Sequence, residues 1–447
     1  MKLNHLIIIG ALCGALLLPS SASSWGVVGL SAGAGGGGVS WGDAPPSKNV
    51  WYSCSPFGTG DLKTGSPTIT IETGGKATLS VAQTGNIGQG DRVTYNTSSV
   101  AYIAKVVDSS HFYLVTATGG TPGNVSGQTV NSIAHEYASL SAAEAGFTDS
   151  SHINNSSLVT ADVIVNLVCY YDHDDYTADT TQVLFWGATT DATRYVNIYA
   201  PIGGEQSINN NQHAGKWSDT NAYRLVVSDD YAFGVYSYVK LVATGLQCKN
   251  SRATGGNTVQ LQSNTNVYID KFIAVTTAGG YANIPVYTFS GGTYWLTNSV
   301  VVGASTSTSN NWGVTQGSSD AMYIYNCTIS NNQTGVVRTD GTLTVTNCAV
   351  FNNGDDFWGS STTIDYCASD DGDGDHAVNI SPGATEATDW AAAFTDYANG
   401  DFSVKDTDSA LYGAGIVQTG VTTDIIGTSR GTVGNACDIG AFEYVSE

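Results

Sequence analysis

One pattern of hydrophobic and polar positions occurs three times between residues 322 and 371. The copies are MYIYNCTISNN, LTVTNCAVFNN and a weaker TTIDYCASDDG. Their cysteines lie 21 and 19 residues apart, and each follows a β-branched residue by three positions: the pairs are Ile324 and Cys327, Val345 and Cys348, and Ile364 and Cys367. A β-rich repeat of about 20 residues predicts a solenoid, in which each turn stacks on the previous one.

Asparagine explains how each turn bends. Asn326 and Asn347 directly precede a cysteine, and asparagine tolerates the left-handed backbone conformation that resets the alternation of a strand. Residues on both sides of the bend can then point inward. The same inward column extends to earlier turns, with spacings of 26, 27 and 28 residues, at Leu246, Phe272 and Ser299. These turns carry longer loops, so we expect the loops of residues 170–320 to form a binding face.

This stretch resembles the right-handed parallel β-helix of the pectin-lyase-like superfamily. The resemblance rests on the column just described and on the polar residue near the end of each copy, at Asn331, Asn352 and Asp371. It implies an all-β fold with stacked parallel strands. The superfamily includes polysaccharide lyases, glycosidases, adhesins and phage spikes, so the implied fold does not by itself select a function.

The residues before the solenoid predict an added module. Strict alternation of hydrophobic and polar residues at positions 68–71, 93–95 and 112–115 indicates half-buried antiparallel strands. We therefore expect residues 50–137 to form a small inserted β module that caps the solenoid. Residues 138–150 predict a short capping helix, with Ser141 and Glu144 spaced as a capping box and Gly146 at its end. The parallel β-helix is expected over residues 138–375.

The solenoid pattern stops after Gly374, and residues 376–447 are expected to close the structure. The string DIGAFE, from Asp438 to Glu443, resembles the closing segment of secreted bacterial β-helix proteins. Arg430 is expected to form a structural ion pair with Asp424 or Asp438, because its planar guanidinium suits a carboxylate.

The N-terminus predicts export. Residues 1–22 combine a lysine, an apolar run and small residues, the pattern of a secretory signal peptide, and a glycine-rich arm follows over residues 23–49. No later apolar stretch approaches the roughly 20 residues that a membrane helix needs, so we expect no membrane insertion. The sequence therefore predicts a protein that is secreted or held at the cell surface.

Charge and composition limit the classes of partner that the protein can bind. The formal net charge is -22, which disfavours nucleic acid and anionic membranes as partners. Charged residues make up only 12% of the chain and aromatic residues 10%, a composition that supports a folded core. Seven cysteines remain after the signal peptide, and those in the repeat are expected to be inert core thiols, although one adjacent pair could form a disulfide.

A catalytic site is not evident. Asp355 and Asp356 resemble the paired aspartates of the polygalacturonase type, but the other motifs of that family are missing. Between residues 253 and 404 the only basic residues are Lys271 and Arg338, whereas a lyase needs a base together with further cations or a metal. We interpret the aspartate pair as turn residues. A polysaccharide lyase or glycoside hydrolase that uses it is the alternative.

Two further groups could bind ligands. The string SDDGDGDH predicts either a solvated turn or a calcium site whose oxygen ligands would be Asp370, Asp371, Asp373 and Asp375. Aromatic and histidine side chains are the candidates for contact with a sugar, namely His213, Trp217, Trp295 and Trp312. Our hypothesis is a non-enzymatic protein that acts in glycan binding or surface attachment, with a polysaccharide or a cell-surface glycan as its partner.

Overall fold

The computed structural model describes residue 41 and residues 43–45, 48–171, 177–262, 266–306, 309–318, 320–360, 362–370, 372–380 and 386–446. The expected signal peptide, most of the glycine-rich arm and Asp371 lie outside the described residues. The expected fold class is confirmed: the described chain is a parallel β-helix with a small antiparallel module and a few short helices.

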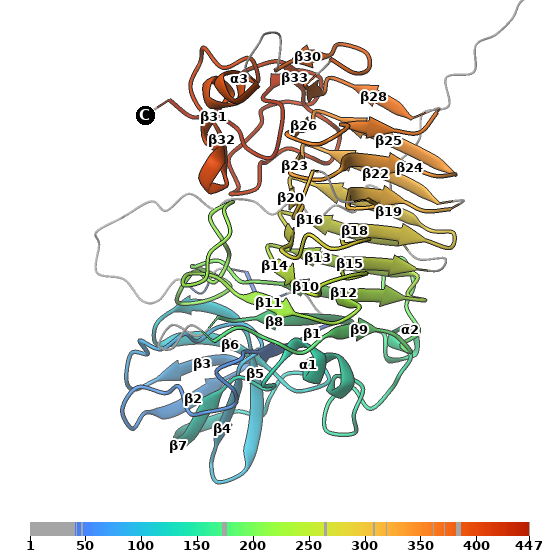
Figure 1. Ribbon diagram of the computed structural model, residues 1–447. Coiled ribbons are helices and arrows are strands. Elements are labelled where there is room, and N and C mark those ends of the chain that lie inside the picture. The colour runs from blue at the N-terminus through green and yellow to red at the C-terminus, as the bar shows by residue number, and fades with distance from the viewer. Residues whose placement is uncertain are drawn as a thin grey trace, which may run out of the picture. The chain divides into compact units, whose positions relative to one another are not determined.

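Three parallel sheets enclose the core, and successive turns are stacked strand on strand (Figure 1). The nine-stranded sheet contains β1 (Asn49–Cys54), β8 (Ile164–Cys169), β10 (Val196–Tyr199), β13 (Lys240–Thr244), β16 (Asn266–Asp270), β19 (Thr293–Thr297), β22 (Ala321–Tyr325), β25 (Thr342–Thr346) and β28 (Thr363–Asp365). The eight-stranded sheet contains β11 (Arg224–Val227), β14 (Gln247–Asn250), β17 (Ile273–Thr276), β20 (Val300–Val302), β23 (Thr328–Ser330), β26 (Ala349–Phe351), β29 (Ala368–Ser369) and β30 (Val378–Asn379). The seven-stranded sheet contains β9 (Val183–Phe185), β12 (Tyr231–Tyr236), β15 (Asn257–Gln262), β18 (Ile284–Phe289), β21 (Trp312–Gln316), β24 (Thr334–Arg338) and β27 (Phe357–Trp358).

The register confirms the predicted inward column. Val345 pairs with Ile324 on one side and with Ile364 on the other. The bend between the nine-stranded and eight-stranded sheets is a single left-handed residue in every turn from β13 onward, with φ between 46° and 71°, at Gly245, Lys271, Asn298, Asn326, Asn347, Tyr366 and His376. Asparagine therefore makes the bend as expected, and lysine, tyrosine and histidine adopt the same strained conformation elsewhere.

The antiparallel module is a closed six-stranded barrel inserted between β1 and β8. Its strands are β2 (Thr68–Glu72), β3 (Lys76–Leu79), β4 (Arg92–Tyr95), β5 (Ser99–Asp108), β6 (His111–Val115) and β7 (Val125–Ala134). The start of the predicted module needs correction, because β1 pairs in parallel with β8 over its whole length and is the first strand of the solenoid. At the other end the solenoid extends past Gly374, since β30 pairs with β29.

Three short α-helices are present among the described residues. They are α1 (Leu140–Gly146), α2 (Leu158–Ala161) and α3 (Glu386–Ala393), and only α1 was expected. The proposed capping box is wrong: Ser139 caps α1 by accepting a hydrogen bond from the Ala142 N–H, while Ser141 lies inside the helix. In the described part of the chain, no helix is long and apolar enough to cross a membrane.

The C-terminal residues cover the outer face of the eight-stranded sheet. This closing segment, residues 386–446, adds β31 (Phe394–Asp396), β32 (Asp401–Val404), β33 (Gly415–Ile416) and β34 (Ala436–Cys437). Its buried Leu411, Ile439 and Phe442 belong to one hydrophobic cluster with Ala349 and Phe351 of β26. Phe351 also stacks on Phe394, with ring centroids 4.6 Å apart.

Six cysteines lie in the interior of the solenoid, and all are buried and free: Cys54, Cys169, Cys248, Cys327, Cys348 and Cys367. Cys437, on β34 of the closing segment, is also buried and free. Burial raises the pKa of the Cys348 and Cys367 thiols well above their usual value. The expected ladder of inert thiols is therefore present beneath the bend.

Candidate functional site

The aspartate pair does not form a catalytic constellation. Asp355 is exposed on a turn, whereas Asp356 is 4% exposed. The Asp356 carboxylate accepts hydrogen bonds from the Asn353 side-chain amide at 2.9 Å and from the Asp370 N–H at 2.7 Å. The Asp356 side chain therefore binds one group of its own turn and one of the next turn of the solenoid.

Three of the four residues suggested for calcium, Asp370, Asp373 and Asp375, lie within the described chain. Both oxygens of Asp370 accept hydrogen bonds, from the Asn352 N–H at 3.0 Å and from the Trp390 indole N–H at 2.8 Å. Asp373 donates its backbone N–H to the Ser369 hydroxyl, and Asp375 lies exposed on the same turn. Among the described residues, which leave out Asp371, no three acidic, histidine or cysteine side chains are grouped to hold a metal ion.

His213 is a structural residue of the loop between β10 and β11. Its ring is 4% exposed and contacts the Lys271 carbonyl oxygen at 2.8 Å through Nε2, while Nδ1 accepts a hydrogen bond from the Gly215 N–H at 3.1 Å. Burial lowers the pKa of His213 to about 4, so the ring is neutral at physiological pH. Both ring nitrogens are therefore occupied by the protein.

Trp217 lies in the same loop and packs toward the closing segment. Its indole N–H donates to Asp219 at 3.0 Å, and the Lys249 ammonium lies 4.0 Å from the ring centroid. The ring also contacts the hydrophobic cluster beneath the closing segment. Close approach of the two segments requires Gly215, where a Cβ atom would lie 2.4 Å from the Phe442 ring.

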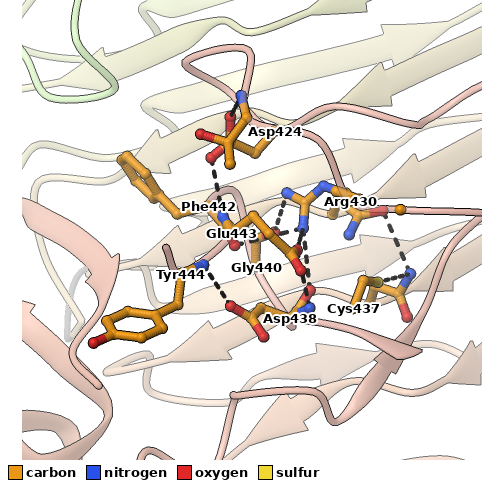
Figure 2. A network of polar contacts seen from close by, with 12 residues as sticks. Asp424, Arg430, Cys437, Asp438, Gly440, Phe442, Glu443 and Tyr444 are labelled. Carbon is orange, nitrogen blue, oxygen red and sulfur yellow. Dashed lines mark hydrogen bonds and ion pairs between the residues drawn. The ribbon is translucent and has the colours of Figure 1, made fainter. Parts of the chain in front are cut away.

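A buried polar network holds the closing segment (Figure 2). The Arg430 side chain is fully buried and pairs with Glu443 at 3.1 Å, while its second terminal nitrogen donates to the Gly440 carbonyl oxygen at 3.0 Å. The expected partners were wrong in detail: Asp424 accepts from the Glu443 N–H and Asp438 from the Tyr444 N–H, and neither forms an ion pair with Arg430. The network ties the DIGAFE string to the preceding residues Asp424 and Arg430 and has a structural role.

The asparagine bend contributes a second contact to the closing segment. The Asn347 side chain accepts from the Ile416 N–H at 3.0 Å and donates to the Ile416 carbonyl oxygen at 2.6 Å. Its own carbonyl oxygen accepts from the Gly440 N–H at 2.8 Å. Asn347 therefore both bends the strand and anchors β33.

Two buried carboxylate and histidine pairs involve residues at the ends of barrel strands. Asp91 contacts His135 at 2.7 Å, and Glu136 contacts His152 at 3.1 Å. The Asp91 side chain is fully buried, and the other three side chains are at most 8% exposed. The first pair joins the start of β4 to the end of β7, and the second joins the end of β7 to the segment between α1 and α2.

The nine-stranded sheet presents a different surface. From β13 to β25 its outward side chains form three columns that run from turn to turn. We call these positions the open face: Lys240, Asn266, Thr293, Ala321 and Thr342; Val242, Tyr268, Trp295, Tyr323 and Thr344; and Thr244, Asp270, Thr297, Tyr325 and Thr346. Most of these residues are half-buried, as expected for side chains that stand on a solvent-facing sheet.

Three rings in the middle column stack on one another. This aromatic ladder consists of Tyr268, Trp295 and Tyr323, whose successive centroids are 4.2 Å and 5.7 Å apart with interplanar angles of 2° and 17°. The two faces of Trp295 are therefore covered by its neighbours. A sugar cannot stack on Trp295 as on an isolated ring. The three side chains are half-buried, and their hydroxyl and indole N–H groups lie at the ring edges.

The open face carries little unpaired charge. The Lys240 ammonium lies 3.9 Å from the Tyr195 ring centroid and 5.7 Å from that of Tyr268, at one end of the ladder. Asp270 accepts hydrogen bonds from the Thr297 hydroxyl at 2.7 Å and from the Asn298 amide at 2.8 Å, and burial raises its pKa. The groups that the open face presents to a ligand are mainly hydroxyl groups, amides and the edges of aromatic rings.

The ladder was only partly predicted. Of the four candidate sugar contacts, Trp295 lies in it, whereas Trp312 begins β21 on the seven-stranded sheet and the other two lie under or beside the closing segment. Tyr268 and Tyr323 were missed. Each ladder residue precedes the inward column at Phe272, Ser299 or Cys327 by four positions, so the same spacing could have identified them.

Comparisons of this chain with protein-family models, with curated proteins and with solved structures found no match.

Proposed function

We propose that this protein is a secreted or surface-associated β-helix protein that binds a glycan through the open face and does not cleave it. The observation that carries the proposal is the aromatic ladder, with polar columns on both sides. Hydroxyl groups, amides and aromatic edges are the groups that bind sugars without charge. The resemblance to pectin-lyase-like proteins, and to the closing segments of secreted bacterial β-helix proteins, supports a location outside the cell or at its surface.

The absence of catalysis is part of the proposal. A lyase or glycosidase must place charged groups where charge develops in the transition state. The acidic candidates at Asp355, Asp356, Asp370 and Asp373 are turn residues with backbone or side-chain partners. The alternative, a lyase or glycoside hydrolase of the pectin-lyase-like type, would need a set of groups that these contacts do not provide.

The test combines binding and turnover on the protein without its predicted signal peptide. A glycan array and retention on immobilised polysaccharides should reveal binding, and assays for reducing sugar and unsaturated products should stay at background with or without Ca²⁺. Trp295→Phe keeps a stacked ring but removes the indole N–H, so it should weaken binding. Trp358→Phe is the matched control, because Trp358 is 53% exposed on the seven-stranded sheet.

Two results would count against the proposal. Release of oligosaccharide that is lost in Asp355→Asn or Asp373→Asn, with an unchanged circular dichroism spectrum, would establish the enzyme instead. Equal weakening by Trp295→Phe and Trp358→Phe would show that the open face is not the binding site.

A further inference from the structure

The open face has a direction, and this direction limits the shape of a ligand. Along the solenoid axis, a ligand meets the same kind of side chain once per turn, every roughly 4.8 Å. Tyr268, Trp295 and Tyr323 form one such row, and Thr293 and Thr297 stand on either side of Trp295. Across the sheet, by contrast, a strand of five residues ends at the bend after roughly 16 Å. Only the axial direction provides repeated contacts.

The ring geometry limits the mode of contact. Since Tyr268 and Tyr323 cover both faces of Trp295, the ladder exposes ring edges rather than ring faces. Edges of tyrosine and tryptophan carry O–H and N–H groups that form hydrogen bonds. Thr293 flanks the ladder and Thr344 continues its row, and their hydroxyls add further donors and acceptors; the Thr297 hydroxyl, which donates to Asp270, can still accept.

The charge distribution limits the ligand class. The whole chain has a net charge of -22, which repels polyanions. The open face offers no cluster of cations to offset this, because Lys240 is placed over two tyrosine rings at one end of the ladder. A neutral polysaccharide avoids this repulsion and can still form hydrogen bonds with the rows of hydroxyl groups.

From these observations we infer that the ligand is an extended, neutral polysaccharide that lies along the solenoid axis and is recognised over several consecutive sugars rather than at a chain end. This inference rests on the proposed function and adds the class and orientation of the glycan. From β13 to β25 the open face covers four steps between turns, or roughly 19 Å. Affinity should therefore grow with ligand length and then level off.

The test is a length series measured by isothermal titration calorimetry on the protein without its predicted signal peptide. Cello-oligosaccharides and chito-oligosaccharides from the disaccharide to the hexasaccharide supply the neutral series, and oligogalacturonates of the same lengths supply the anionic one. If the glycan array identifies another neutral backbone, the neutral series is made from that backbone. We expect the dissociation constant to fall with each added sugar and then to level off, with weaker or no binding of the anionic series.

Ring-preserving variants locate the contact. Tyr268→Phe and Tyr323→Phe keep the stack and remove one hydroxyl each, so each should weaken binding of the longest neutral oligosaccharide about three- to tenfold. Tyr412→Phe is the control, because Tyr412 is 46% exposed in the closing segment and should bind as the unmodified protein does.

The outcomes separate the inference from the function on which it rests. Affinity that is independent of length, loss of binding when the chain ends are blocked, or tighter binding of the anionic series would overturn the inference while glycan binding itself stands. Unchanged affinity in both Tyr268→Phe and Tyr323→Phe would also overturn the inference, because the contact would then lie elsewhere. Absence of binding to every glycan on the array and in both series would overturn the proposed function itself.

Discussion

Strands β25 and β26 belong to the same turn of the solenoid, yet their outward side chains meet different surroundings. On β25, Thr342 is exposed and Thr344 half-buried, and neither lies in the hydrophobic cluster beneath the closing segment. On β26, Ala349 and Phe351 are fully buried under that segment. Only two residues lie between the two strands: Asn347, which makes the bend, and the buried Cys348.

The difference follows from the outward residues themselves. Parallel sheets usually have both faces covered, and the eight-stranded sheet conforms to this with outward Ile273, Val300 and Phe351. The nine-stranded sheet places threonine, asparagine and stacked rings at the equivalent positions. Stacking buries the ring faces within the ladder, so the open face needs no cover to hide them. The comparison therefore separates a face built for stability from one available for binding.

The largest expected effect comes from placing a charge on each face. Ala349→Asp would bury a carboxylate beneath the closing segment without a partner, and we expect it to lower the free energy of unfolding by about 5 kcal/mol. Thr344→Asp, five positions earlier on the open face, should change it by less than about 0.5 kcal/mol. Urea unfolding followed by circular dichroism measures both variants. Similar losses in both would show that the open face is covered as well.

Removal of the buried arginine should rank second. Arg430→Met leaves Glu443 and the Gly440 carbonyl oxygen without their partner, and breaking a buried ion pair costs about 3 to 5 kcal/mol. We expect the lower end of this range, because the Glu443 side chain is 15% exposed and can be rehydrated. Arg252→Met is the control: Arg252 pairs with Asp230 at the surface, where such pairs contribute at most about 1 kcal/mol. An equal effect of the two variants would argue against a structural role for the network.

The covered face, which is the outward side of the eight-stranded sheet beneath the closing segment, and the open face were not equally predictable from the sequence. Cys327 and Cys348 fix the register because inward residues in a parallel solenoid must stack on like residues. Asn347 was predicted as the bend, but its contacts with Ile416 could not be foreseen, since they join positions 69 residues apart. The same limitation explains why Arg430 was assigned Asp424 or Asp438 rather than Glu443.

Local signals failed where tertiary pairing decides the structure. The strand NVWYSC of β1 reads like the strands of the barrel that follow it, and only its pairing with β8 assigns it to the solenoid. Helix α3 was missed although its sequence, EATDWAAA, is rich in alanine, the residue with the highest helix propensity. The aromatic ladder was recoverable, as noted above, but the long loops of the early turns obscured the repeat there.

A smaller effect should come from deleting one hydroxyl on each face of a single turn. Thr328 on β23 accepts a hydrogen bond from the Ala441 N–H of the closing segment at 3.1 Å. Thr328→Val leaves that buried N–H unsatisfied and should cost about 1 to 2 kcal/mol of unfolding free energy, with no change in glycan binding. Tyr323→Phe on β22 should show the reverse: unchanged stability and weaker binding. If Thr328→Val and Tyr323→Phe change stability and glycan binding in the same way, the two faces do not have different roles.

The smallest expected effect is a pH dependence of stability to which the closing segment contributes through Glu443. Burial raises the pKa of Glu443 to about 7 from its usual 4.5, despite the neighbouring Arg430. Between these two values the folded protein binds the proton more tightly than the unfolded chain does, so stability should fall as the pH rises from about 4.5 to 7 and then level off.

The magnitude and the controls follow from the position of the carboxyl group. The full shift would correspond to about 3 kcal/mol, and solvent screening of this partly exposed group should reduce the effect to under about 1 kcal/mol. Glu443→Gln should remove part of the loss measured by urea unfolding at pH 5 and pH 8. Glu144→Gln on α1 should remove another part, because burial also raises the pKa of Glu144 to about 7.

Glycan binding should stay constant over the same pH range, because Tyr268 and Tyr325 of the open face stay protonated. Burial raises the pKa of Tyr268, and it raises the pKa of the adjacent Tyr325 to about 12. Stability that rises with pH, or binding that changes between pH 5 and pH 8, would contradict the division between the two faces.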